Sequence, residues 1–294
     1  MNISKFRLKI KNGFVQFKDS LGWSFKLLRR MELGKWSTIV IGLHGLLLVV
    51  LQNFLGLLSW FFLGNFYRAE VTQALTKYNM DFISYILLGV FFSRLIVAGS
   101  GTMIHFKVYD PAFRLMYMSR IDPLRFTIIS LLFQSFAYTL PELMLQFFIL
   151  FAIFKIYVPS FIIFAGGILI ALYTAVVNFI FYLSVDSLIL HIPALRTSNY
   201  HPVREVISLL TAIIDGRYYP VEVLPQFLRF FIYFFPSSNG LLAIRLYMAG
   251  SSEYLYHLFA LTILALVFTP ITRGIIRKGI DRVRSEGFVM SPLR

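Results

Sequence analysis

Three residues of metal-binding type, Asp186, His191 and His201, lie close together in the sequence after a long apolar run. Zinc prefers imidazole, thiolate and carboxylate ligands, and a helix presents two of them on one face at positions i and i+4. None of the three has that spacing, and Pro193 separates the first two from the third. His44 has no other His, Asp or Glu nearby to share an ion. The sequence therefore predicts no metal site.

Two charged residues, Arg94 and Glu142, stand inside apolar runs. A charged side chain within the hydrocarbon costs about 2.5 to 3.5 kcal/mol on insertion scales, so it needs a partner or water. Counted from the expected cytoplasmic ends of their helices, the two differ in depth by about 9 Å. Two interpretations stay open: an intramembrane ion pair, or separate exposure of each residue to an aqueous path or the outer interface.

The chain contains no phosphate-binding loop of the form G-x-x-x-x-G-K-[ST]. In ATPases the amides and lysine of that loop hold the nucleotide phosphates. Cysteine is absent, which excludes disulfides and thiolate metal sites. We therefore expect no enzymatic activity of this chain by itself, and no cofactor bound by it.

The composition is that of an all-α integral membrane protein. Hydrophobic residues make up 58% of the 294 positions, charged residues 14%, and the mean hydropathy is +0.73. Soluble domains carry about 25% charged residues. The net charge of +14 comes from basic residues in the polar segments between apolar runs, which favours a lipid-facing cytoplasmic surface over nucleic-acid binding.

The apolar runs predict six transmembrane helices, because a helix needs about 20 residues to cross a bilayer. Most basic residues then fall on the cytoplasmic side, as the positive-inside rule requires. We predict a multi-pass protein of the cell membrane with both termini cytoplasmic. The parts are an N-terminal segment (1–36), a six-helix domain (37–272) and a basic cytoplasmic tail (273–294), with spans at about 36–63, 81–106, 124–154, 161–190, 202–215 and 253–271.

Two segments outside these spans have helical patterns of their own. In the N-terminal segment, apolar residues at spacings of three and four, from Phe14 to Leu28, predict an amphipathic helix in the cytoplasmic interface. Between spans two and three, an aspartate with proline after it predicts the start of a short cytoplasmic helix. Its exposed aromatic and basic residues favour a protein contact over the lipid surface; the residues are Asp110, Pro111, Phe113, Arg114, Met116, Tyr117 and Arg120.

The stretch from Gly216 to Arg245 is too apolar for an ordinary loop, and prolines break it. A broken apolar segment persists at membrane depth only where protein or a water-filled cavity covers its free backbone groups. We predict two short helices that enter and leave on the same side, as a re-entrant hairpin before the last span. Its aromatic side chains could line a path or pack against helices and lipid: Tyr218, Phe230, Phe231, Tyr233 and Phe234.

This stretch resembles the extracellular re-entrant signature of type-2 ABC transporter permeases. The residues that carry the resemblance are Gly216, Tyr219, Pro220, Leu224, Pro225, Leu228, Pro236 and Arg245. The N-terminal amphipathic helix and the short helix at 110–120 resemble the connecting and coupling helices of that family. Residues Arg29, Arg30, Lys35, Trp36 and Gly42 are similar to the entry of its polysaccharide-exporting members, while the re-entrant pattern is equally similar to drug and lipid exporters.

The resemblance implies an ATP-driven exporter. The chain would be its permease subunit, pairing with a second permease copy, as a homodimer or with a close paralogue, within the membrane lipids. Separate ABC ATPase subunits would carry ATP and Mg and would receive residues 111 to 118 in a groove. Two alternatives remain: a membrane enzyme acting on lipid-linked substrates, for which Asp186 and His191 are the candidates, or an ATP-independent channel or carrier.

Overall fold

The computed structural model describes residues 51, 58, 73–97, 143–144, 146–148, 160–191 and 202–285. These residues form helices and turns, and there is no strand among them. The helical class predicted from composition is therefore confirmed for this part of the chain. The N-terminal amphipathic helix, the coupling helix and nearly all of the first and third predicted spans lie outside the described residues.

Two described helices are long and apolar enough to cross a membrane. The first, α8 (Phe161–Ser187), begins where the Ser160 hydroxyl accepts a hydrogen bond from the Ile162 amide at 3.1 Å, and a 3₁₀ turn, η3 (Leu188–His191), continues it. The second, α13 (Tyr254–Ser285), is apolar from Tyr254 to Gly279. Since α13 runs on to Ser285, the first half of the predicted tail is helical and continues the apolar part of α13.

The predicted six-span topology is not supported by the described residues alone, which hold two such helices, or three if one bent pair is counted as a span. The helix α4 (Phe82–Val97) forms the start of the predicted second span. The helix α10 (Pro202–Ile214) occupies the place of the fifth. Its 13 residues rise about 20 Å, less than the hydrocarbon thickness of about 30 Å, so α10 alone is too short for a full crossing.

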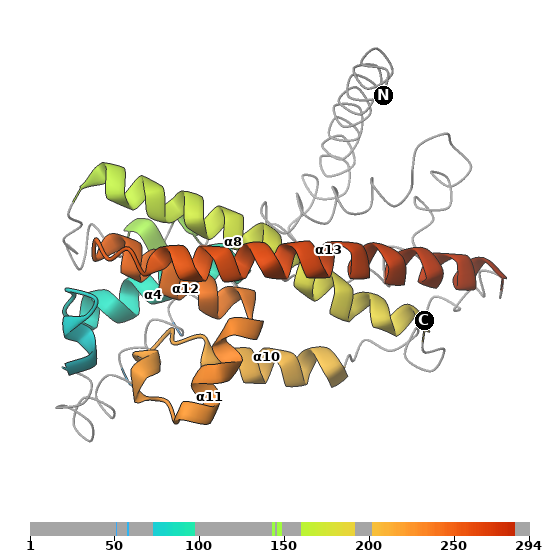
Figure 1. Ribbon diagram of the computed structural model, residues 1–294, viewed down its shortest axis with the longest axis horizontal. Helices are drawn as coiled ribbons and strands as arrows, with labels where there is room; N and C mark the ends of the chain where they lie inside the picture. The colour runs from blue at the N-terminus through green and yellow to red at the C-terminus, as the bar shows by residue number, and fades with distance from the viewer. Residues whose placement is uncertain are drawn as a thin grey trace, which may run out of the picture.

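The helices α8 and α13 run in the same direction (Figure 1). The Tyr173 hydroxyl lies 3.1 Å from that of Thr262, and further along both helices the Thr272 hydroxyl donates to the Ile180 carbonyl at 3.2 Å. Residue numbers thus increase together along the contact. Two parallel helices in one chain require the intervening chain to return across the bundle.

The helix α4 has the same direction as α8. Its Phe92 ring packs on Phe164 near the start of α8, with ring centroids 5.7 Å apart, and the Asn178 amide donates to the Ile96 carbonyl further along. We call the end at which α4, α8 and α13 begin the N-terminal end of the bundle; it lies toward the left in Figure 1.

The helix α12 (Pro236–Met248) packs against α8 in the opposite direction. A Cβ at Gly240 would meet the Thr174 side chain, and a Cβ at Gly166 would meet the Tyr247 ring. Small residues therefore permit the close approach of these helices. Since Thr174 lies about 20 Å along α8 from its start, α12 begins deep in the bundle and runs back toward its N-terminal end.

The apolar segment before α12 is broken into short pieces, as predicted. It consists of η4 (Val221–Val223), α11 (Gln226–Phe231) and η5 (Ile232–Phe234), and the chain bends by 99° between η5 and α12. Pro220 and Pro225 precede the first two pieces, and Pro236 is the first residue of α12. A proline is tolerated in the first turn because its missing N–H has no intrahelical partner there. We call residues 216–248 the broken segment and the bend at Phe235 its elbow.

Both ends of the broken segment lie at the N-terminal end of the bundle. Lys77, in the turn before α4, lies 3.8 Å from a carboxylate oxygen of Glu222 and 2.8 Å from one of Glu253. Glu222 belongs to η4, near the start of the segment, and Glu253 immediately precedes α13. One lysine therefore bridges the entry and the exit of the segment.

Candidate functional site

Arg245 is the centre of a buried polar cluster at the N-terminal end of the bundle. It stands in α12 and is 1% exposed. Its Nη1 donates to the Tyr85 hydroxyl at 2.6 Å and to the Gly216 carbonyl at 2.7 Å, and its Nη2 donates to the carbonyls of Tyr85 and Arg217, each at 3.1 Å. The guanidinium thus ties the turn at the start of the broken segment to α4 and α12.

The aromatic ring of Tyr85 also faces the guanidinium. The Cζ atom of Arg245 lies 3.5 Å from the ring centroid, a cation–π contact. Among the residues that the structure describes, none forms an ion pair with Arg245, so its charge is stabilised by oxygen dipoles and one ring. Because a buried charge without such partners is costly, these contacts fix the position of the turn strongly.

Gly216 has a geometry that only glycine adopts easily. Its φ is +66°, in the left-handed region, and a Cβ there would meet Val221. The Tyr85 hydroxyl lies 3.4 Å from the Gly216 carbonyl and 3.3 Å from that of Tyr219. The carbonyls of the turn therefore converge on Tyr85 and Arg245.

The flanking residues of this turn are also paired. The Arg217 side chain donates to the Asp215 carboxylate at 2.9 Å, and the Tyr219 hydroxyl donates to the Ile213 carbonyl. The Tyr218 ring lies beside the Arg217 guanidinium, 5.7 Å from it. These contacts hold the end of α10 against the start of the broken segment.

Asn239, which is fully buried, satisfies the backbone at the elbow. Its Nδ2 donates to the carbonyls of Ile232 at 2.9 Å and Phe235 at 3.1 Å. Its Oδ1 lies 3.1 Å from Nδ1 of His257, and since an amide oxygen only accepts, the imidazole donates. One side chain therefore covers backbone groups that the break in the helix leaves free.

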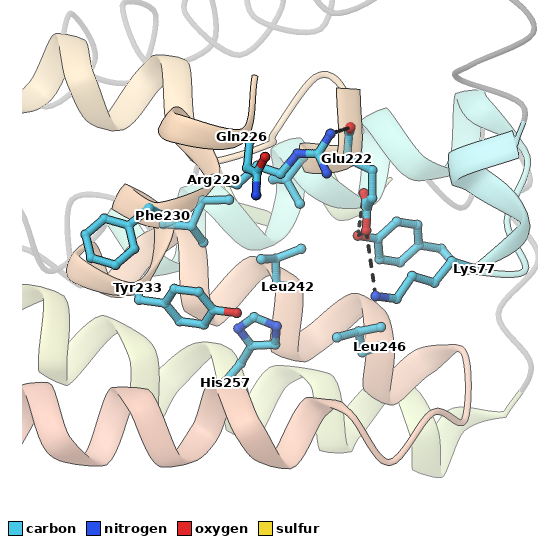
Figure 2. Close-up of a pocket in the computed structure, with 12 residues that line it drawn as sticks. Lys77, Glu222, Gln226, Arg229, Phe230, Tyr233, Leu242, Leu246 and His257 are labelled. Atoms are coloured by element: carbon cyan, nitrogen blue, oxygen red, sulfur yellow. Dashed lines mark hydrogen bonds and ion pairs between the residues drawn. The ribbon is translucent and has the colours of Figure 1, made fainter. Parts of the chain in front are cut away.

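A cavity of about 350 Å³ lies beside α11 and η5, between them and the starts of α4 and α13 (Figure 2). Its floor includes Leu242 and Leu246 of α12. Tyr233 and His257 stack on one side of it, with ring centroids 5.9 Å apart and planes within 7°. Its other polar lining residues are Lys77, Tyr78, Glu222, Gln226 and Arg229.

Tyr78 connects the polar lining of the cavity to the buried core. Its hydroxyl donates to both carboxylate oxygens of Glu222, at 2.9 and 3.1 Å. Burial, followed by the charges of Tyr85 and Glu222, raises the pKa of Tyr78 well above its usual value. The phenol therefore stays protonated and keeps donating to Glu222 at any physiological pH.

The structure brings together most of the predicted signature residues. Gly216, Tyr219 and Arg245 meet through the contacts above, Leu224 is buried, and Pro220, Pro225 and Pro236 precede or begin the helical pieces. Of the predicted path-lining aromatics, Phe230 and Tyr233 line the cavity, while Phe231 and Phe234 are exposed and pack on Phe230.

Several residues of this site were not identified from the sequence. Lys77, Tyr78 and Tyr85 lie more than 130 positions before their partners, and no local pattern marks them. The polar run Ser237-Ser238-Asn239 inside an apolar stretch was a usable signal for the elbow.

The remaining predicted site residues are placed elsewhere or not described. Arg94 is half-buried in the last turn of α4. Its predicted partner Glu142 lies outside the described residues, as do His44, His201 and all the coupling residues from Asp110 to Arg120.

The two remaining metal-type candidates have separate hydrogen-bond partners. Asp186 pairs with Arg204 at 2.8 Å, and the His191 ring lies 3.0 Å from the Ile275 carbonyl. Within the described ranges no three His, Cys, Asp or Glu side chains are grouped for a metal.

Comparison of the chain with protein-family models, with curated proteins and with solved structures gave no significant match.

Proposed function

We propose that the chain is the transmembrane permease subunit of an ATP-driven exporter of the type-2 ABC class. The observation that carries the proposal is the broken segment, which bends by 99° inside the bundle and has both ends bridged by Lys77. The two outermost residues of the family-like signature, Gly216 and Arg245, are hydrogen-bonded to each other at 2.7 Å. Because these two residues of the sequence signature also touch in the structure, the resemblance has more support than the spacing alone gives it.

In this proposal the protein has six spans and cytoplasmic termini, and the N-terminal end of the bundle faces outward. A second permease copy completes the path, and separate ATPase subunits bind at residues 110–120. The aromatic side chains of α11 and η5 face the path or the surrounding lipid, since Phe230, Phe231 and Phe234 are each about half exposed or more.

In this proposal the helix α4 connects the coupling residues to the turn at Gly216. Tyr85 lies in its first turn and receives Arg245, while its other end leads in sequence to the coupling residues. A movement of the coupling helix would be transmitted along α4 to the turn at Gly216. The contacts of Arg245 would then move the broken segment at the opposite side of the membrane.

The proposal is tested by purifying the tagged chain from its native membranes in mild detergent and measuring ATP hydrolysis. We expect an ATPase carrying a phosphate-binding loop to copurify. The double variant Phe113→Ala, Met116→Asp should lose it, because the change removes apolar groups from the coupling helix and adds a charge. Phe259→Ala on the exposed face of α13 is the matched control and should retain it.

Two results would contradict the proposal. One is ATP hydrolysis by the chain purified to homogeneity without another subunit. The other is the same composition of the purified complex for the coupling double variant and the wild type.

A further inference from the structure

Glu222 presents an incompletely neutralised carboxylate to the cavity beside α11. Its nearest donor is the neutral phenol of Tyr78, at 2.9 and 3.1 Å. Lys77 lies 3.8 Å from it, at the long end of an ion pair, and lies closer to Glu253, at 2.8 Å. The carboxylate therefore retains capacity for a cation from the cavity.

Arg229 presents the opposite charge to the same cavity (Figure 2). Its Nε donates to the Leu224 carbonyl at 2.7 Å, and its Nη2 donates to the Glu222 carbonyl. Both acceptors are neutral backbone oxygens, and no described carboxylate lies within ion-pair distance of the guanidinium. The guanidinium is held in place by the backbone while its charge stays available to an anion.

We infer that this cavity binds a zwitterion with a primary ammonium and an oxyanion, namely the phosphoethanolamine headgroup of a membrane phospholipid. The ammonium lies at Glu222 and the phosphate at Arg229 and Gln226. A primary ammonium donates hydrogen bonds to the carboxylate, whereas a quaternary ammonium has no N–H to donate. An anionic headgroup without an amine would leave Glu222 facing a negative charge.

The location of the cavity favours a lipid over a free solute as its occupant. It lies near the N-terminus of α13, which is apolar enough to span a membrane, and thus at the depth where headgroups gather. Its floor, Leu242 and Leu246, and the exposed Phe230 at its edge suit the glycerol and the first methylenes of a lipid. A volume of about 350 Å³ is in the range of small-molecule sites. The inference depends on membrane placement and not on the proposed transport function.

The test compares three lipids with identical acyl chains, carrying ethanolamine, choline or glycerol headgroups. The delipidated full chain in nonionic detergent receives them in equal amounts, and native mass spectrometry measures the retained adducts. We expect the ethanolamine lipid to be retained about tenfold more than the others, the effect of one charge-assisted hydrogen bond. Glu222→Gln, which still accepts from Tyr78, should abolish this preference.

Asp81→Asn is the matched control. Asp81 is a carboxylate in the same turn region that caps α4 by accepting from the Ser84 amide at 3.1 Å, and it does not line the cavity. Asparagine is an equally good cap, so the preference should survive this substitution. Free O-phosphoethanolamine, at the same concentration, should displace the lipid weakly because it lacks the apolar part.

Four outcomes would overturn the inference. Equal retention of the three lipids by the wild type, or strongest retention of the glycerol headgroup, contradicts a zwitterion site without any variant. An unchanged preference in Glu222→Gln excludes Glu222 as the ammonium partner. Displacement by free O-phosphoethanolamine as effective as by the lipid excludes a lipid as the specific occupant.

Discussion

The two arms of the elbow, α11 and α12, are both apolar, yet their surroundings are opposite. Every residue of α12 except Tyr247 is buried against α4, α8 and α13, while no residue of α11 is buried. The buried arm also carries the polar groups, Asn239 and Arg245, that hold the segment together. The comparison indicates that α12 anchors the broken segment, whereas α11 presents its aromatic side chains outward.

The largest effect should come from removing the polar anchor of α12. Arg245→Met leaves the Gly216, Arg217 and Tyr85 carbonyls and the Tyr85 hydroxyl without their buried donor, which should lower the free energy of unfolding by about 1 to 3 kcal/mol for each group left unsatisfied. Thermal unfolding in detergent measures the change. Arg273→Met, at an exposed position of α13, is the control, and an equal loss of stability in both variants would contradict the anchoring role.

A matched pair of truncations tests the comparison directly. Leu241→Ala in α12, where the side chain is 1% exposed, should cost about 2 to 5 kcal/mol through the lost burial and the cavity left behind. Phe231→Ala in α11, where it is 47% exposed, should cost about 0.5 kcal/mol or less, as at other surface positions. Similar melting temperatures for the two variants would show that the arms do not differ in this way.

The link between the broken segment and the turn before α4 should have an intermediate effect. Tyr78→Phe removes the hydroxyl that donates to Glu222, a loss of about 1.5 kcal/mol for a hydrogen bond to a charged group. The control is Tyr256→Phe, on the exposed surface of α13. Equal unfolding midpoints for Tyr78→Phe and the wild type would exclude this link as a stabilising contact.

The smallest effect should be the pH dependence of the Lys77–Glu253 pair. The hydrogen bond and the positive charge of Lys77 lower the pKa of Glu253 in the folded protein. Stabilisation by a carboxylate with a lowered folded-state pKa is present above its unfolded pKa and is lost as pH falls through the folded one. The stability difference between the wild type and Glu253→Gln should therefore be present at neutral pH and disappear in acid. If the stability difference between the two proteins did not change with pH, the Lys77–Glu253 pair would not be its cause. The expected difference is small because the pair is exposed to solvent.

The sequence predicted the local features of the fold better than its long-range ones. The helix beginning at Phe161 and the proline-broken segment after Gly216 follow from hydropathy and from the missing proline donor, which act over a few residues. The contacts of Arg245 with Tyr85 join positions 160 apart, and such a pairing leaves no trace in a local pattern. The predicted bounds of the fifth span, about 202–215, agree with those of α10 (Pro202–Ile214), although this helix alone is too short for a full crossing.

In the proposed topology the broken segment enters and leaves the membrane on one side, and single-cysteine labelling tests this placement most directly. The chain has no cysteine, so Gln226→Cys, Ser252→Cys and Lys278→Cys each introduce one reactive thiol without background. A membrane-impermeant maleimide applied to intact cells should label positions 226 and 252, while position 278 should react only after the membrane is opened. Labelling of 226 and 252 from opposite sides would show that the segment crosses the bilayer and would contradict the account.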